Sequence, residues 1–136
     1  MQTKPDVEQM LMQSLKELVL VIPLEKITIK EITDKAQVIR PTFYNHFQDK
    51  YELLSYIYLH ELFADITKGV NYDNWYERLE GFLVNMLKDK RFYSNTLKSN
   101  EKIFEHYLFR SMHKLFIRFF LSLIHISEPT RLLSIS

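Results

Sequence analysis

The sequence predicts an all-α protein, and three observations support this fold class. Apolar residues recur at steps of three and four along most of the chain, which is the spacing of one face of an α-helix. Thr, Asp and Asn residues that can cap a helix stand just before several of these patterns. Only two Gly and four Pro occur among 136 residues, too few for the tight turns of a β-sandwich or for a glycine-rich phosphate loop.

Composition narrows the class of protein further. Apolar residues (46%) and charged residues (26%) occur in globular proportions, so we do not expect a disordered chain. The 18 Lys and Arg nearly cancel the 17 Asp and Glu, and any basic patch for nucleic acid must therefore be local. The absence of Cys excludes disulfides, a thiol nucleophile and Cys-bound zinc.

We expect a soluble, cytoplasmic protein. The N-terminal segment has no basic region that leads into an apolar core, so no signal peptide is predicted. The longest apolar run, residues 115–126, is interrupted by Arg118 and is shorter than the ~20 residues that span a bilayer. No membrane partner is therefore expected.

The first predicted helix ends at Pro23, with Pro5 allowed in its first turn. Its apolar stripe consists of Val7, Met10, Leu11, Leu15, Leu18, Val19 and Ile22. A second helix is predicted from Ile29 to Ala36, because Thr28 and Glu31 before it have the spacing of a capping box. This helix is short, so we expect packing to hold it more than intrinsic propensity.

A three-residue break separates this helix from a second short segment, RPTFYNHF. Pro41 suits the first turn of a helix, and Phe43 and Phe47 share the face that we expect to point inward. Asp49 has capping spacing and starts a longer helix that we expect to run to Gly69. This order of elements is that of a helix-turn-helix.

The outward face of the segment after the break carries groups that can contact DNA. A helix fits the major groove, where Arg can contact guanine or a phosphate and Asn can match an adenine edge. Thr, Tyr and His supply donors for phosphate oxygens, and the free N–H groups at helix starts favour an anion. The candidate contacts are Thr28, Lys30, Arg40, Pro41, Thr42, Tyr44, Asn45, His46 and Lys50.

The local charge predicts only weak binding by one copy of this segment. Residues 26–50 contain five basic and three acidic residues, an excess of two. The residues alone leave a second interpretation open, in which Tyr44 and His46 are ordinary half-buried residues on the surface of a helical bundle.

The string ITIKEITDKAQVIRPTFYNHFQDKYELL resembles the DNA-binding domain of TetR-family transcriptional regulators. The shared pattern is a Thr cap, an I-x-x-x-A-x-V turn and the run T-F-Y-x-H-F-x-x-K-x-x-L. The resemblance covers residues 10–58. The matching positions are Thr28, Ile32, Ala36, Val38, Thr42, Phe43, Tyr44, His46, Phe47, Lys50 and Leu53.

The resemblance implies roles that the residues alone do not assign. Arg40–Phe47 would be the recognition helix, with Arg40 as the reader of bases and both phenylalanines in the core. The partner would be double-stranded DNA in the bacterial cytoplasm, at the nucleoid. A homodimer and a small-molecule or protein effector are further expectations. The expected phosphate or groove contacts are Thr28, Thr42, Tyr44, His46 and Lys50.

Two positions depart from the family pattern. The turn usually carries Gly where this chain has Gln37, at a position that we expect to need a left-handed backbone. Ile39 replaces the usual Ser or Asn helix cap, which should cost about 1 kcal/mol of local stability.

The second half predicts three further helical segments. Asn74 and Glu77 have capping spacing and open a helix that reaches about Leu87, and the segment DKRFYSNTL follows. The last helix carries a stripe of Ile103, Phe104, Tyr107, Leu108, Ser111, Leu115 and Phe119. NWYERLEGFL with DKRFYSNTL resembles the ligand-binding and dimerisation half of a TetR subgroup in Firmicutes, related to the activators of dihydroxyacetone kinase operons.

Aromatic residues are dense in this half, and two interpretations are open. They form either an inducer pocket or a helical core, and we favour the core because helical spacing accounts for most of them. Ligand-binding residues are therefore not assigned. The residues are Trp75, Tyr76, Phe82, Phe92, Tyr93, Phe104, Tyr107, Phe109, Phe116, Phe119 and Phe120.

We expect three parts in the chain. Residues 1–48 form the DNA-binding domain, residues 49–121 form part of a helical regulatory and dimerisation domain, and residues 122–136 are a tail. The family resemblance implies two more long helices, so the sequence is interpreted as truncated at its C-terminus. The tail has no clear helical period after Ile126, is broken by Pro129 and resembles translated sequencing-adapter DNA, so we expect it to be non-native or disordered.

A helical protein-interaction module without DNA binding is the alternative function, and an enzyme is a third class. The chain has no HExxH spacing, no two His three or four residues apart and no Gly-flanked serine nucleophile. His106 and His113 share a helix face near Glu105, which is typical of solvated surface. We therefore expect no catalytic residue, no metal site and no cofactor.

Overall fold

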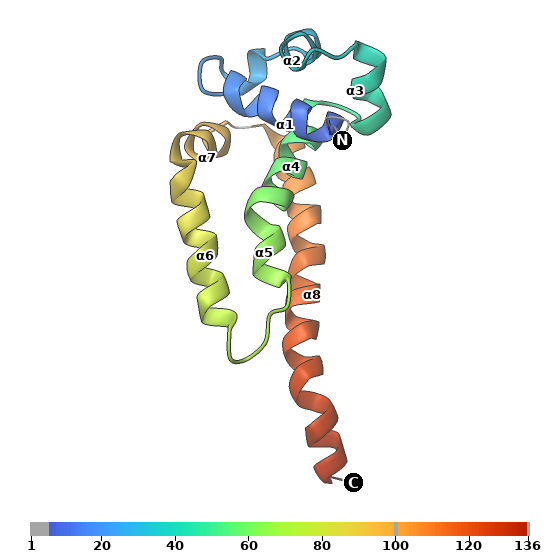
Figure 1. Cartoon of the computed structure of the whole chain (residues 1–136), viewed down its shortest axis with the longest axis vertical. Coiled ribbons are helices and arrows are strands. Elements are labelled where there is room, and N and C mark those ends of the chain that lie inside the picture. Colours follow the sequence, from blue (N-terminus) through green and yellow to red (C-terminus); the bar gives the residue numbers. More distant parts are fainter. Residues whose placement is uncertain (1–5, 100, 136) are drawn as a thin grey trace, which may run out of the picture.

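The computed structural model describes residues 6–99 and 101–135, except for the side chains of residues 67 and 125–135. The regular elements of this part are all helical, which confirms the all-α prediction, and Pro5 lies outside it. In order they are α1 (Val7–Leu18), η1 (Leu24–Lys26), α2 (Ile29–Ala36), α3 (Arg40–His46), α4 (Lys50–Tyr58), η2 (Leu59–Phe63), α5 (Ala64–Thr67), α6 (Trp75–Lys88), α7 (Lys90–Leu97) and α8 (Lys102–Ile135). Figure 1 shows α1, α2 and α3 lying across one end of the longer helices.

Helix α1 ends earlier than the apolar stripe predicted. Asp6 caps its start by accepting a hydrogen bond from the Glu8 N–H at 3.0 Å, but the helix stops at Leu18 and not at Pro23. The intervening residues include three β-branched side chains, which lower helix propensity. Pro23 also disfavours helical geometry in the residue before it. The chain therefore turns away after Leu18 and forms the short 3₁₀-helix η1.

The helix-turn-helix forms as predicted, with one residue of difference. The Thr28 hydroxyl accepts from the Glu31 N–H, the Glu31 carboxylate accepts from the Thr28 N–H, and the predicted capping box at α2 is thereby confirmed. Gln37 adopts the left-handed conformation expected there, with φ 59° and ψ 42°. Ile39 occupies the N-cap of α3 without a side-chain hydrogen bond, also as expected. Helix α3 ends at His46, one residue before the predicted end.

The long helix predicted from Asp49 to Gly69 contains a segment that the sequence did not predict. Asp49 caps α4 as expected, through a hydrogen bond from the Glu52 N–H at 2.9 Å. Between α4 and α5 the chain forms the π-helix η2, in which the Ala64 N–H bonds to the Leu59 carbonyl five residues earlier. The helical segment ends near Gly69, whose φ is 65°.

The helix predicted to open at Asn74 is confirmed as α6, but two finer predictions about the second half are wrong. Asn74 lies at the N-cap of α6, but its side chain makes no capping hydrogen bond. The Asn74 side chain instead accepts from the Asn71 N–H at 2.7 Å and donates to the Gly69 carbonyl at 2.9 Å, which closes the preceding turn. Helix α8 continues past Pro129 to Ile135, although a break was predicted after Ile126. A proline removes one helical hydrogen bond and can kink a helix, but it does not have to end it.

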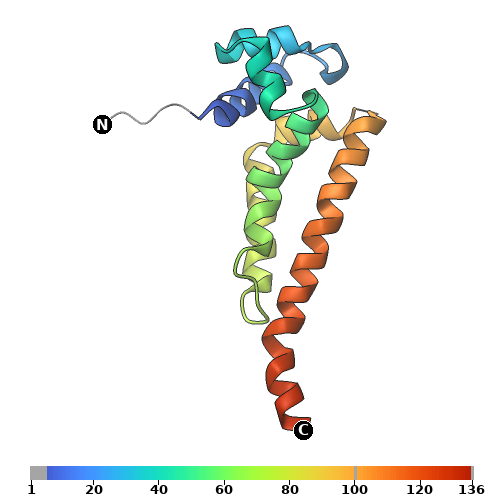
Figure 2. The same ribbon diagram turned by 90° about the vertical axis from the view of Figure 1, so that its right-hand side faces the viewer.

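One buried core joins the cap of α1–α3 to the longer helices. It starts with Leu11 and Leu15 of α1, continues through Phe43 and Leu53, and reaches Phe104 of α8. Figure 2 shows α4 leading from this cap into the long helices, with α8 alongside. The division of the chain near residue 48 stays a prediction, because burial is continuous across that position.

Polar contacts also tie α1 to the second half. The Lys16 ammonium donates to Glu61 of η2 at 2.6 Å and to Asp89, just before α7, at 2.9 Å. Burial lowers the pKa of Lys16, but its two carboxylate partners outweigh this effect and the pKa is raised above its usual value. The Asn95 amide of α7 donates to the Val19 carbonyl at 3.0 Å. The position of α1 is therefore linked to both η2 and α7.

Replacing Phe47 by Ala should unfold this core in large part. The Phe47 ring is 4% exposed, and removing a buried aromatic ring costs about 3–5 kcal/mol. Urea denaturation measures the free energy of unfolding, with Phe109→Ala as the control because that ring is 78% exposed. Equal stability of the two variants would show that Phe47 is not part of the core.

Replacing Gln37 by Gly should stabilise the protein. A left-handed conformation costs an L-residue about 1–2 kcal/mol that Gly does not lose, so the free energy of unfolding should rise by up to about 1 kcal/mol. The matched control is Gln13→Gly in α1, where Gly should lower it by about 1 kcal/mol. A loss of stability at both positions would contradict the strain assigned to Gln37.

Candidate nucleic-acid interface

Helix α3 has one buried face and one exposed face, and it lies at the outer edge of the cap (Figure 1). Phe43 is fully buried, and the ring of Phe47 packs edge-on against Tyr56 of α4 with centroids 5.2 Å apart. The opposite face exposes a cation, a phenol, an amide and an imidazole within two helical turns. The exposed residues of α3 are Arg40, Pro41, Tyr44, Asn45 and His46, whereas Thr42 is half-buried.

Arg40 and Tyr44 are available for contacts outside the chain. Tyr44 is 50% exposed, and its ring touches Phe43 edge-on with centroids 5.3 Å apart. Arg40 forms no ion pair with the residues that the structure describes. A guanidinium without an internal partner, on an exposed helix start, is suited to a phosphate or a base edge.

The predicted contacts at the start of α2 are already engaged within the chain. The Thr28 hydroxyl belongs to the capping box, and the Lys30 ammonium lies 2.8 Å from Asp34 in an exposed ion pair. The hydrogen bond that Lys30 donates to Asp34 raises the pKa of Lys30. Both side chains lie on exposed surface and would have to exchange these partners to reach a phosphate.

Lys50 has a structural role that the sequence did not reveal. Its ammonium donates to the Leu24 carbonyl at 2.7 Å and to the Ile27 carbonyl at 2.8 Å, at the two ends of the turn that carries η1. Burial lowers the pKa of Lys50, and nearby carboxylates, Glu101 first, oppose part of this decrease. An ammonium has three donors, so these bonds leave one for a phosphate.

His46 is tied to α1 at the end of α3. Its Nδ1 lies 3.2 Å from a carboxylate oxygen of Glu8. A hydrogen bond from Tyr56 lowers the pKa of Glu8, desolvation opposes this, and His46 lowers it further. Burial, followed in size by the hydrogen bond to Glu8, raises the pKa of Tyr56 to about 12. Glu8 and Tyr56 thus position the end of α3, and no sequence pattern predicts contacts across 38 residues.

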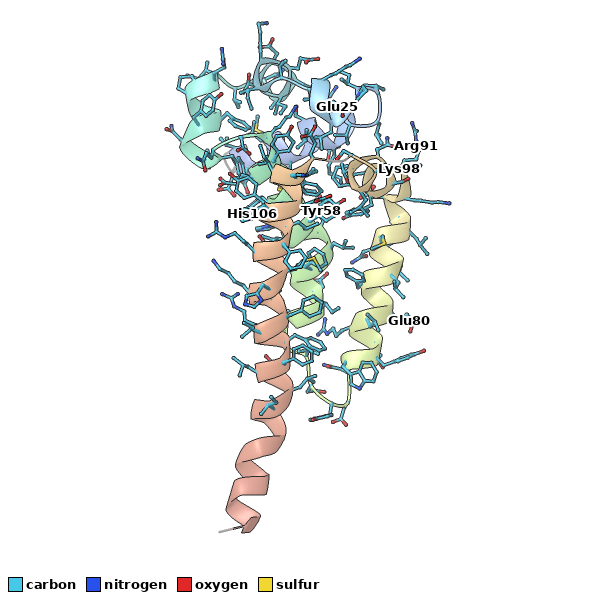
Figure 3. All side chains as sticks on the ribbon, turned by 180° about the vertical axis from the view of Figure 1, so that it is seen from behind. Glu25, Tyr58, Glu80, Arg91, Lys98 and His106 are labelled. Carbon is cyan, nitrogen blue, oxygen red and sulfur yellow. The ribbon has the colours of Figure 1, made fainter. Side chains whose placement is uncertain are left out.

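The other candidate groups do not form a polar site. His106 and His113 of α8 are exposed, and Figure 3 shows His106 pointing away from the bundle. Among the side chains that the structure describes, no group of three could hold a metal ion. Over the same part of the chain, the helices lack the combination of length and apolar character that a membrane span requires.

The aromatic residues of the second half divide between core and surface. Phe92, Tyr93 and Phe104 are buried and surround Tyr58, which is labelled in Figure 3. Others are exposed, so the core interpretation accounts for only part of the set. Helices α5, α6 and α8, with η2, also enclose an apolar pocket of about 350 Å³, lined by Phe63, Ile66, Trp75, Leu79, Phe82, Met112, Leu115, Phe116 and Phe119.

A short helix, a tight left-handed turn and a second short helix with a polar outer face define the class of helix-turn-helix DNA-binding domains. The comparison with protein families agrees. The family described as "Bacterial regulatory proteins, tetR family" matches residues 22–57, from just before η1 to the last turn of α4. Over this stretch the chain is similar to the DNA-binding domain of TetR-family regulators.

A curated relative is similar over a longer stretch. The HTH-type dhaKLM operon transcriptional activator DhaS of Lactococcus lactis subsp. lactis (strain IL1403) is 27% identical over 100 residues. The match covers 74% of this chain and 53% of the relative, so the chain spans about half the length of that protein. The subgroup expected from the second half is thereby supported.

Replacing Lys50 by Met should lower the free energy of unfolding by about 1–3 kcal/mol, because the carbonyls of Leu24 and Ile27 lose their donor. The control is Lys30→Met, whose exposed ion pair should contribute no more than about 0.5 kcal/mol. Thermal unfolding followed by circular dichroism compares the two. Equal melting temperatures would remove the structural role of Lys50.

Proposed function

We propose that the chain is a sequence-specific DNA-binding regulator of transcription, with α3 lying in the major groove. One observation carries this proposal: Phe43 and Phe47 hold α3 in the core, and this leaves Arg40, Tyr44 and Asn45 on the outside. The match of residues 22–57 to the TetR family supports the same function. A helix with this arrangement of groups has the size and chemistry that major-groove recognition requires.

Each predicted contact takes a role in this proposal that follows from its position. Arg40 at the start of α3 contacts guanine or a phosphate, and Asn45 one turn later contacts an adenine edge. Tyr44 and the remaining groups fix the position of the helix through phosphate oxygens. These remaining groups are Thr28, Lys30, Pro41, Thr42, His46 and Lys50.

Two copies would be needed for tight binding. The net excess of two positive charges over residues 26–50 provides little affinity in one copy. A homodimer would place two recognition helices about 34 Å apart, one turn of DNA, and would convert two weak contacts into a strong one. From DhaS, named as a transcriptional activator, we carry over only the control of transcription.

An effector would act through the second half of the chain. The apolar pocket between α6 and α8 supports a small apolar effector, because its lining offers almost no polar group for a charged one. Residues from about 49 to 121 would thus form the regulatory part. The proposal includes no catalytic step, and a cytoplasmic location at the nucleoid follows from it.

Salt dependence separates this function from the alternative of a protein-binding helical module. Affinity for duplex DNA should fall steeply with salt, by a slope of about −0.9 per phosphate contacted, whereas an apolar protein interface responds little.

Arg40→Ala and Tyr44→Ala should each weaken binding to a selected duplex by about 5-fold to 150-fold, while helicity is unchanged. Fluorescence anisotropy of labelled DNA measures the affinity and circular dichroism measures the helicity. The control is Arg91→Ala, an exposed arginine on α7, on the side of the bundle away from α3 (Figure 3). The assignment of these contacts is wrong if both variants bind DNA as tightly as the parent.

A further inference from the structure

The start of α3 differs from the starts of the three neighbouring helices. A side chain caps each of α1, α2 and α4, through Asp6, Thr28 and Asp49 respectively. At α3 the cap position is Ile39, whose side chain cannot accept a hydrogen bond. A helix start without a side-chain cap typically lowers the folding equilibrium constant about fivefold.

Ile39 also exposes most of its side chain. It is 67% exposed, and between residues 28 and 47 the exposed large apolar side chains that the structure describes are those of Ile39 and Tyr44. Both belong to the start and the outer face of α3. Single exposed aliphatic residues are common, but here exposure and a missing cap coincide at one position.

The packing of the domain does not account for Ile39. Among the described residues, Ile39 belongs neither to the buried core nor to the partly buried residues packed against it. Its carbonyl accepts hydrogen bonds from the N–H groups of Thr42 and Phe43, which any residue could provide. Positions that break local rules without a folding benefit are the ones where a functional role is expected.

We propose that Ile39 reads the 5-methyl group of a thymine in the major groove. This inference rests on the proposed DNA-binding function. The N-terminal residues of a recognition helix meet the base edges, and thymine presents an apolar group there, its C5-methyl. Ile39 thus supplies apolar recognition beside the polar recognition by Arg40, and it selects a T·A pair next to the base that Arg40 contacts.

Deoxyuridine tests this inference, because it differs from thymidine only by that methyl group. A duplex is first selected from a random pool with the full chain, and each thymine in it is then replaced in turn. Replacement of one particular thymine in each recognised site should lower the affinity of the parent about fourfold. This loss corresponds to one buried methyl group at about 0.8 kcal/mol. The Ile39→Ala variant should bind the thymine duplex and the deoxyuridine duplex equally.

Two variants control for folding and for exposed apolar surface in general. Ile39→Ser should raise the melting temperature, since Ser restores a cap, and should abolish the preference for thymine over deoxyuridine. Val21→Ala changes another β-branched residue, which is 77% exposed and lies between α1 and η1, and should keep the preference.

The outcomes are distinguishable. If a duplex is enriched but the parent binds its thymine and deoxyuridine forms equally, the role of Ile39 is overturned and the proposed function stays in place. The same conclusion follows if Ile39→Ala loses as much affinity for the deoxyuridine form as the parent does. If no duplex is enriched over the random pool, the proposed function itself fails, and the role of Ile39 fails with it.

Discussion

The burial of Phe43 and Phe47 is the constraint on which the rest of the proposed DNA-binding surface depends. Helix α3 has only seven residues, and a helix of this length is not stable in water by itself. Two aromatic rings, one turn apart and packed into the core to which α1, α2 and α4 also contribute, therefore fix both its existence and its rotation. Once that rotation is fixed, Arg40 and Tyr44 have to face outward. The polar surface is a consequence of the apolar packing beneath it.

The same core extends into the second half, and this continuity would connect the proposed effector pocket to the DNA-binding segment. Lys16 links α1 to Glu61 in the π-helix and to Asp89 before α7. The π-helix also contributes Phe63 to the apolar pocket. A molecule that entered the pocket would therefore touch the segment that holds α1, and α1 in turn holds the end of α3 through Glu8 and His46. Energetic coupling of this kind between two sites requires packed elements that can adopt two discrete arrangements.

The sequence predicted the local features of the fold well and the non-local ones poorly. The bounds of α2, its capping box and the left-handed turn at Gln37 follow from residues within a few positions of one another. The structural role of Lys50 could not be foreseen, because its carbonyl partners at Leu24 and Ile27 are more than 20 residues away. The π-helix could not be foreseen from the spacing either, because the buried residues Tyr58 and Leu62 keep the α-helical step of four. On the proposed interface, the exposed positions were predicted and the internal partners of Thr28, Lys30 and His46 were not.

The most direct measurement of the central claim is an NMR titration of the ¹⁵N-labelled full chain with duplex DNA, read residue by residue. The largest changes should fall on the backbone between Gln37 and His46, while Glu80 on α6 and Lys98 after α7, both labelled in Figure 3 at a distance from α3, stay unchanged. Perturbation concentrated on α6 and α8, with α3 unaffected at saturating DNA, would contradict the assignment of α3 as the helix that meets DNA.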